Sequence, residues 1–111
     1  MTYQHIRNGI CIVLAIATCL GVAAAAQSKA AMEIKIDNFS FSPAELKIPV
    51  GATIVWTNGD DIPHTVVSID KVFKSKVLDT DEKYSYTFNT AGTYSYFCSI
   101  HPKMTGKVIV Q

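Results

Sequence analysis

Three side chains with metal-binding atoms follow one another at equal spacing near the C-terminal end of the sequence. Cys98, His101 and Met104 form a Cys-x-x-His-x-x-Met pattern, which offers a thiolate, an imidazole and a thioether within one short loop. A second imidazole, His64, follows Pro63 further upstream. Two histidines, one cysteine and one methionine are the ligand set of a trigonal copper site with a weak, long axial thioether. We therefore predict that His64, Cys98, His101 and Met104 bind one copper ion.

This set of donor atoms suits a metal ion that changes its oxidation state. Soft sulfur ligands favour copper(I), and imidazole nitrogen suits copper(II). Zinc sites use four strong ligands or keep one position open for water, and a methionine serves neither purpose. From residue 31 onward the sequence contains no other histidine or cysteine than His64, Cys98 and His101. The residues thus predict a carrier of single electrons that cycles between Cu(II) and Cu(I).

The same four ligands leave other functions open. A copper chaperone or copper-buffering protein would use them to deliver the ion rather than electrons, although the sequence has no methionine-rich or histidine-rich tract for exchanging copper(I). A purely structural sandwich with a buried, inert Cys98 is a further alternative. An enzyme is not expected, because the pattern includes neither a second metal site nor an acid–base pair. Reversible one-electron cycling without loss of the metal separates the electron carrier from the chaperone.

The N-terminal part of the chain has the pattern of an export signal. Arg7 lies in a basic start, and an apolar run from Ile10 to Ala26 ends in alanines. This arrangement is typical of a secretory signal peptide. We predict a signal peptide over residues 1–26, with cleavage as late as Ala30 as an alternative, and a periplasmic location. An uncleaved membrane anchor is the other interpretation, but the run is short for a spanning helix of about 20 residues.

The remaining residues, 31–111, are predicted to form one domain. The whole chain has 111 residues, of which 17% are charged, and a formal net charge of +1. Because this charge gives no basic surface, nucleic acid is not an expected partner. Removal of the signal peptide would leave Cys98 as the single cysteine of a protein in an oxidising compartment, where an exposed thiol is prone to oxidation. We therefore expect Cys98 to be protected by burial or by a metal, and we expect a monomer.

Short stretches of β-branched and aromatic residues alternate with glycine, proline, asparagine and aspartate from Met32 onward. This pattern predicts an all-β domain. About eight short strands joined by turns fit a Greek-key β-sandwich better than an open meander. The expected strands are Glu33 to Phe39, Glu45 to Ile48, Thr53 to Thr57, His64 to Ile69, Phe73 to Leu78, Tyr84 to Phe88, Gly92 to Cys98 and Gly106 to Val110.

Alternation within these strands predicts the core. Ile34 and Ile36 share one face of the first strand, and Ile54 and Trp56 share one face of the third. These four side chains are therefore core candidates. The same alternation places Tyr84, Tyr86 and Phe88 on one face of their strand, and Tyr94, Tyr96 and Cys98 on one face of theirs.

The domain resembles the cupredoxins, the small blue-copper proteins, and within them it is most similar to the amicyanins. The short Cys-x-x-His-x-x-Met loop is the most specific part of this resemblance, because plastocyanins and pseudoazurins have longer or differently spaced ligand loops. The resemblance implies a cupredoxin fold, one type 1 copper ion and electron transport. Its motifs are Phe41-Ser42-Pro43, Val55-Trp56-Thr57-Asn58, Pro63-His64, Gly92 to Cys98, and His101 to Met104.

The resemblance also implies residue roles around the site. Asn58 would donate its backbone amide to the Cys98 sulfur, and its side chain would tie the loop at Ser99, which would hold the ligands at a fixed separation. The amicyanin pattern has proline where this chain has Ile100. We hypothesise that the Ile100 N–H donates a second hydrogen bond to Cys98 and raises the reduction potential.

The expected route for electrons is the edge of His101, with His64, Cys98 and Met104 deeper in the protein. Prolines and Ile100 around this edge would form a small apolar docking surface for transient contacts with redox proteins. Lys103 stands where the amicyanin pattern has a large apolar residue. The methylamine-oxidising dehydrogenase that amicyanins serve is therefore only one candidate partner, and a protein with an acidic docking rim is another. The membrane would be contacted only by an uncleaved signal segment.

Overall fold

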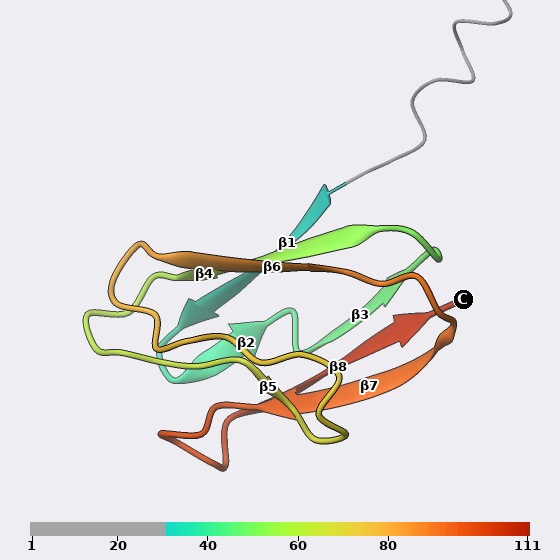
Figure 1. Cartoon of the computed structure of the whole chain (residues 1–111). Helices are drawn as coiled ribbons and strands as arrows, with labels where there is room; N and C mark the ends of the chain where they lie inside the picture. The colour runs from blue at the N-terminus through green and yellow to red at the C-terminus, as the bar shows by residue number, and fades with distance from the viewer. Residues whose placement is uncertain (1–30) are drawn as a thin grey trace, which may run out of the picture.

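Two four-stranded β-sheets face each other in the computed structural model, which describes residues 31–111 (Figure 1). The strand order is β2-β1-β4-β6 in one sheet and β3-β8-β7-β5 in the other. The predicted all-β sandwich of eight strands is confirmed. The predicted signal peptide over residues 1–26, with Ala30 as the later cleavage site, lies outside the described residues. The strands are β1 (Ala31–Asp37), β2 (Ser40–Ser42), β3 (Glu45–Ile48), β4 (Thr53–Asn58), β5 (Val67–Ser68), β6 (Lys83–Thr87), β7 (Gly92–Phe97) and β8 (Thr105–Val110).

The chain crosses between the two sheets several times, as in a Greek key. Strands β1 and β2 form an antiparallel hairpin, β3 crosses to the second sheet, and β4 returns to lie parallel to β1. In the second sheet β3 runs parallel to β8, and β8 pairs antiparallel with β7. Within residues 31–111 there is no helix of the length and apolarity needed to span a membrane.

The structure corrects three of the predicted strands. The first predicted strand, Glu33 to Phe39, ends at Asp37, because Asn38 and Phe39 have positive φ angles of 51° and 56° and turn the chain into β2. The predicted strand from His64 to Ile69 shrinks to Val67–Ser68. The predicted strand from Phe73 to Leu78 is replaced by isolated bridges, one of which joins Leu78 to His64.

A buried serine explains why these last two segments do not form a regular ladder. The Val66 amide donates to Ser75 Oγ at 2.9 Å, so a side chain takes the place of a backbone carbonyl in the pairing. Serine hydroxyls compete with backbone groups in this way. The two segments still exchange backbone hydrogen bonds, between His64 and Leu78 at 3.1 and 2.8 Å and from Ser75 to Val66 at 2.8 Å. His64 therefore lies on an irregular but firmly bonded segment.

The predicted core is confirmed, since Ile34, Ile36, Ile54 and Trp56 are fully buried. The Trp56 ring lies 5.5 Å from Tyr96, 5.6 Å from Phe73 and 5.7 Å from Tyr84, measured between ring centroids. Aromatic pairs of this kind contribute about 0.5–1.5 kcal/mol each beyond the burial of their area. The same buried cluster includes Cys98 and Met104. Two of the predicted copper ligands are therefore part of the core.

Candidate metal centre

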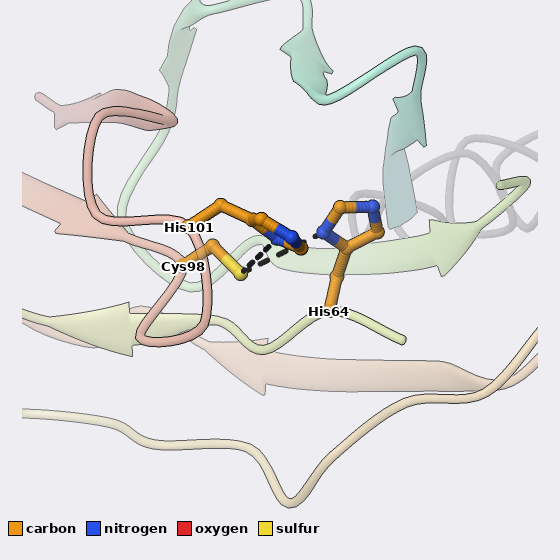
Figure 2. Close-up of side chains that lie close together, drawn as sticks. All are labelled: His64, Cys98 and His101. Carbon is orange, nitrogen blue, oxygen red and sulfur yellow. Dashed lines mark hydrogen bonds between the residues drawn. The ribbon is translucent and has the colours of Figure 1, made fainter. Parts of the chain in front are cut away.

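The side chains of three of the predicted ligand residues lie close together (Figure 2). His64 lies between β4 and β5, Cys98 directly follows β7, and His101 lies in the loop between β7 and β8. Their ligating atoms all lie within 4.8 Å of one another. Cys98 Sγ is 3.6 Å from His64 Nδ1 and 3.8 Å from His101 Nδ1. One thiol and two ring nitrogens thus face a common point.

The fourth predicted residue, Met104, lies at the far end of the same loop. The Cys98 amide donates to the Met104 carbonyl at 3.1 Å, and the Met104 amide donates to the His101 carbonyl at 2.9 Å. The loop is therefore closed at its base, next to the pairing of Phe97 with Thr105. This closure brings the backbone of Met104 back to that of Cys98.

The four residues differ in exposure. His64 and Cys98 are fully buried, Met104 is 5% exposed, and His101 is partly exposed. Exchange of an ion with the solvent would therefore have to pass the His101 side of the site. The other three side chains are enclosed by the protein.

The Cys98 sulfur lies in surroundings that favour its thiolate. Burial opposes ionisation of Cys98, but the Thr65 amide, the His64 and His101 rings and the His101 amide outweigh it and lower its pKa to about 6. Thr65 N lies 3.3 Å from the sulfur, and Thr65 Oγ1 lies 3.8 Å from it. The thiolate is the form of cysteine that binds metals. These surroundings therefore favour the form of Cys98 that a metal ion needs.

Thr65 takes the role that the resemblance assigned to Asn58, so the prediction for Asn58 is wrong. The Ser99 amide donates to Thr65 Oγ1 at 2.7 Å, and the two hydroxyls lie 2.8 Å apart. Asn58 instead donates its own amide to Glu82. Thr65 can reach Cys98 because it directly follows His64, which lies beside the sulfur. Asn58 ends β4, which belongs to the other sheet from β7.

Asn58 holds the loop before His64 in place. It is fully buried, and its side-chain amide donates to the Ile62 carbonyl and to the Leu78 carbonyl, both at 2.9 Å. Its Oδ1 accepts the Asp60 amide at 2.8 Å. Asn58 therefore holds the loop that leads to His64, and it makes no hydrogen bond to the Cys98 sulfur within residues 31–111.

The hydrogen bond that we expected from the Ile100 amide to Cys98 is not found in the part of the chain that the structure describes. The backbone group of this loop that lowers the pKa of Cys98 belongs to His101. Ile100 is 43% exposed and lies on the outside of the loop. The structure therefore does not support the hypothesis that Ile100 raises the reduction potential through its N–H.

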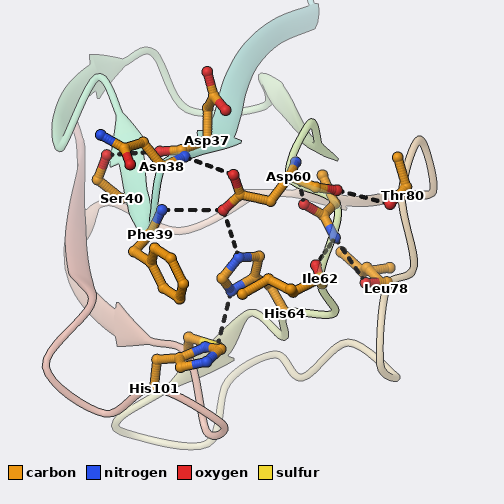
Figure 3. Close-up of polar contacts among 12 residues, drawn as sticks. Asp37, Asn38, Phe39, Ser40, Asp60, Ile62, His64, Leu78, Thr80 and His101 are labelled. Atoms are coloured by element: carbon orange, nitrogen blue, oxygen red, sulfur yellow. Dashed lines mark hydrogen bonds and ion pairs between the residues drawn. The ribbon is translucent and has the colours of Figure 1, made fainter.

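Sequence analysis missed Asp60, which contacts the far side of the His64 ring. His64 Nε2 lies 2.8 Å from Asp60 Oδ2 (Figure 3). The same carboxylate accepts the amides of Asn38 at 2.7 Å and Phe39 at 3.0 Å. The bond from Phe39 is the largest cause that lowers the pKa of Asp60, with Asn38 and His64 adding to it and burial opposing it. The one signal in the sequence is a carboxylate four residues before the histidine.

Phe39 is a second residue that the sequence did not point to. Its ring makes edge contacts with both histidines, with centroid distances of 5.9 Å to His64 and 5.1 Å to His101. It is 53% exposed. One side of the Phe39 ring thus covers the two imidazoles, and the other side is open to solvent.

The donor atoms fit a copper ion, because one thiolate, two imidazoles and a nearby thioether combine ligands for both of its oxidation states. The sequence profile of the Cupredoxin-like domain family matches residues 9–110. The chain belongs to the cupredoxin family. The cofactor of this family, one type 1 copper ion, agrees with the predicted cofactor.

Individual cupredoxins show the same order of similarity as the predicted resemblance. An amicyanin of Paracoccus versutus is 38% identical over 95 residues, which cover 81% of this chain and 72% of that protein. A chloroplastic plastocyanin of Tetradesmus obliquus is 37% identical over 84 residues, 64% of this chain and 58% of that protein. A purple cupredoxin from Nitrosopumilus maritimus has a TM-score of 0.70 at 37% identity, covering 72% of this chain and 99% of that one. The predicted resemblance to cupredoxins, and to amicyanins first, is confirmed.

Proposed function

We propose that this cupredoxin is a periplasmic carrier of single electrons and that His64, Cys98, His101 and Met104 bind its copper ion. The observation that supports this most directly is the convergence of three ligating atoms within 4.8 Å of one another. These atoms come from two segments of the chain that are far apart in the sequence. Bound copper supplies a one-electron couple, Cu(II)/Cu(I), and the protein supplies a fixed arrangement of donors.

The fixed arrangement is what electron transfer requires of the protein. Thr65 holds the Cys98 sulfur, Asp60 holds the His64 ring, and Met104 belongs to the buried core. Each of these contacts restricts the movement of a proposed donor. Because the ligands have little freedom to move, little rearrangement accompanies a change of oxidation state, and the transfer step is fast.

Electrons are proposed to pass through the partly exposed edge of His101. Phe39 and Ile100 are half-exposed beside it, and Pro63 and Pro102 are exposed on the neighbouring loops. Redox partners form small, short-lived interfaces that bury less than about 1,200 Å². An apolar surface of a few side chains is suited to such a contact, and the carrier itself is expected to be a monomer.

The burial of the site favours electron transport over copper delivery. A chaperone must pass its ion to a partner, which requires ligands that a partner can reach. His64 and Cys98 are fully buried and Met104 is 5% exposed, so only His101 is open to such an attack. We therefore propose that the ion stays bound while electrons enter and leave.

The first test is the visible absorption and electron spin resonance spectrum of the protein with Cu(II), followed by reduction and reoxidation. We expect a strong thiolate-to-copper band near ~600 nm that disappears on reduction and returns on reoxidation. Cys98→Ser should remove this band, whereas Ser99→Ala, which changes the neighbouring hydroxyl, should retain it. Copper that binds without colour, or that is released on reduction, would favour the chaperone function instead.

Export is tested separately from electron transfer. N-terminal sequencing of the protein from the periplasmic fraction should give a chain that begins at Gln27 or at Ala31. A chain that retains Met1 in the membrane fraction would contradict the proposed cleavage.

A further inference from the structure

Asp60 accepts hydrogen bonds from three groups that belong to two separate parts of the chain. One is His64 Nε2 at 2.8 Å, and the others are the amides of Asn38 and Phe39 at 2.7 and 3.0 Å (Figure 3). The His64 ring is fully buried, and the Asp60 side chain is 12% exposed. The contact is thus largely shielded from water, which strengthens it.

The backbone of Asp60 is held as well. Its amide donates to Asn58 Oδ1 at 2.8 Å, and its carbonyl accepts the Thr80 hydroxyl at 2.7 Å. Both the main chain and the carboxylate are therefore fixed. A carboxylate fixed in this way holds the imidazole that donates to it in one orientation.

The contact also decides which nitrogen of His64 faces the site. An ionised carboxylate only accepts hydrogen bonds, so the proton of a neutral imidazole lies on Nε2. Where a metal ion replaces the proton of Nδ1, this nitrogen would bind it on the side of the Cys98 sulfur, 3.6 Å away. A carboxylate bonded to the second nitrogen of a metal-binding histidine fixes its tautomer and raises its basicity.

We propose that Asp60 is a positioning residue for His64, and that it strengthens His64 as a ligand for Cu(II) more than for Cu(I), which lowers the reduction potential. The reason for the difference is charge, because a more basic imidazole stabilises the more highly charged ion by a larger amount. The proposal rests on the proposed ligand set. It adds to that set a residue that acts through His64 without touching the ion.

The chain offers a matched control for the charge of Asp60. Asp61 is the next residue and is also acidic, but it is exposed, and no hydrogen bond joins it to His64 within residues 31–111. Asp60→Asn and Asp61→Asn therefore remove the same charge from adjacent positions. They differ in that only the first weakens the contact with the His64 ring. Asp60→Glu retains the carboxylate and is the conservative variant.

The test measures the affinities for Cu(II) and Cu(I) and the reduction potential of the three variants and the wild type. Loss of a carboxylate that supports a metal-binding histidine typically lowers the metal affinity about 10–100-fold. We expect Asp60→Asn to lower the Cu(II) affinity about tenfold more than the Cu(I) affinity, which raises the potential by about 59 mV. Asp60→Glu should lie closer to the wild type, and Asp61→Asn should change the potential by much less. Equal shifts in Asp60→Asn and Asp61→Asn would overturn the proposal, as would an unchanged potential in a blue Asp60→Asn protein.

A measurement on the wild type keeps the test valid if Asp60→Asn does not fold. In the Cu(I) protein, nuclear magnetic resonance should show a His64 Nε2–H proton that exchanges slowly with water. Absence of this proton would refute the proposed contact. A wild type that binds copper without the ~600 nm band would instead refute the proposed function, since that band reports on the thiolate ligand. The two failures are thereby distinguishable.

Discussion

The hydroxyl of Thr65 joins the two segments that carry the proposed ligands, so its removal should destabilise the protein. Thr65→Val keeps the shape of the side chain and the Thr65 amide, which donates to Cys98 at 3.3 Å. It removes the acceptor of the Ser99 amide, which lies 2.7 Å from Thr65 Oγ1. It also removes the contact between the two hydroxyls at 2.8 Å.

The two lost contacts differ in cost. Thr65 is 5% exposed, so little water reaches the Ser99 amide once the hydroxyl has been replaced by a methyl group. A buried donor without a partner costs about 1–3 kcal/mol. The Ser99 hydroxyl is exposed and can bond to water instead, which costs little. We expect Thr65→Val to lower the free energy of unfolding of the metal-free protein by about 2 kcal/mol.

Urea unfolding of the metal-free protein measures this loss, and the Thr87→Val variant is the control. Thr87 also makes a hydroxyl–hydroxyl contact, with Thr53 at 2.7 Å, but on the exposed face of the sheet. Its loss should change the free energy of unfolding by no more than about 0.5 kcal/mol. If Thr65→Val were as stable as Thr87→Val, the Thr65 hydroxyl would not join the two segments, and the reasoning would fail.

Three further predictions concern the surroundings of the site. Asn58→Ala should lower the free energy of unfolding in urea by about 3 kcal/mol, because its three hydrogen bonds are lost in the interior; a loss below about 1 kcal/mol would contradict this. Burial raises the pKa of Tyr96 from 10.0 to about 12, so its contribution to stability is complete below pH 10 and is lost as the pH rises toward 12. The wild type should thus lose about 2 kcal/mol more than Tyr96→Phe over that interval, as measured by urea unfolding at several pH values; parallel curves would contradict it. Met104→Leu should retain the visible band and raise the potential measured by voltammetry, because a weak axial donor to Cu(II) is lost; a lowered potential would exclude that role.

The fold could be predicted where the side chains alternate strictly. Strand β4 places Ile54 and Trp56 inward and fully buried, as the sequence pattern indicated. The prediction failed where a side chain replaces a backbone partner, as Ser75 does for the Val66 amide. It failed again at Phe39, where an aromatic residue at the end of an apparent strand has a positive φ angle of 56°. Periodicity depends only on the types of the residues. It therefore predicts neither a side chain that replaces a backbone partner nor a positive φ angle.

The candidate ligands could be predicted from the sequence, but the residues that hold them in place could not. Cys98, His101 and Met104 lie in one loop, so their spacing carries the information. Thr65 and Asp60 act across the fold, on Cys98 and on the Asn38–Phe39 turn, and their residue types are common in loops. Such roles depend on which segments become neighbours. The resemblance named Asn58 for one of them, but the contacts of the folded chain give this role to Thr65.

The Asp60 carboxylate joins the proposed ligand His64 to the turn that carries Phe39. Phe39 in turn contacts the rings of His64 and His101 and exposes its outer side to solvent. The proposed docking surface and the proposed ligands are therefore parts of one bonded unit on this side of the site. Ile100 is exposed beside His101 and shares none of these bonds within residues 31–111. Changes at Ile100 should thus alter the rate of electron transfer with a partner at constant potential, whereas changes at Asp60 should alter the potential itself.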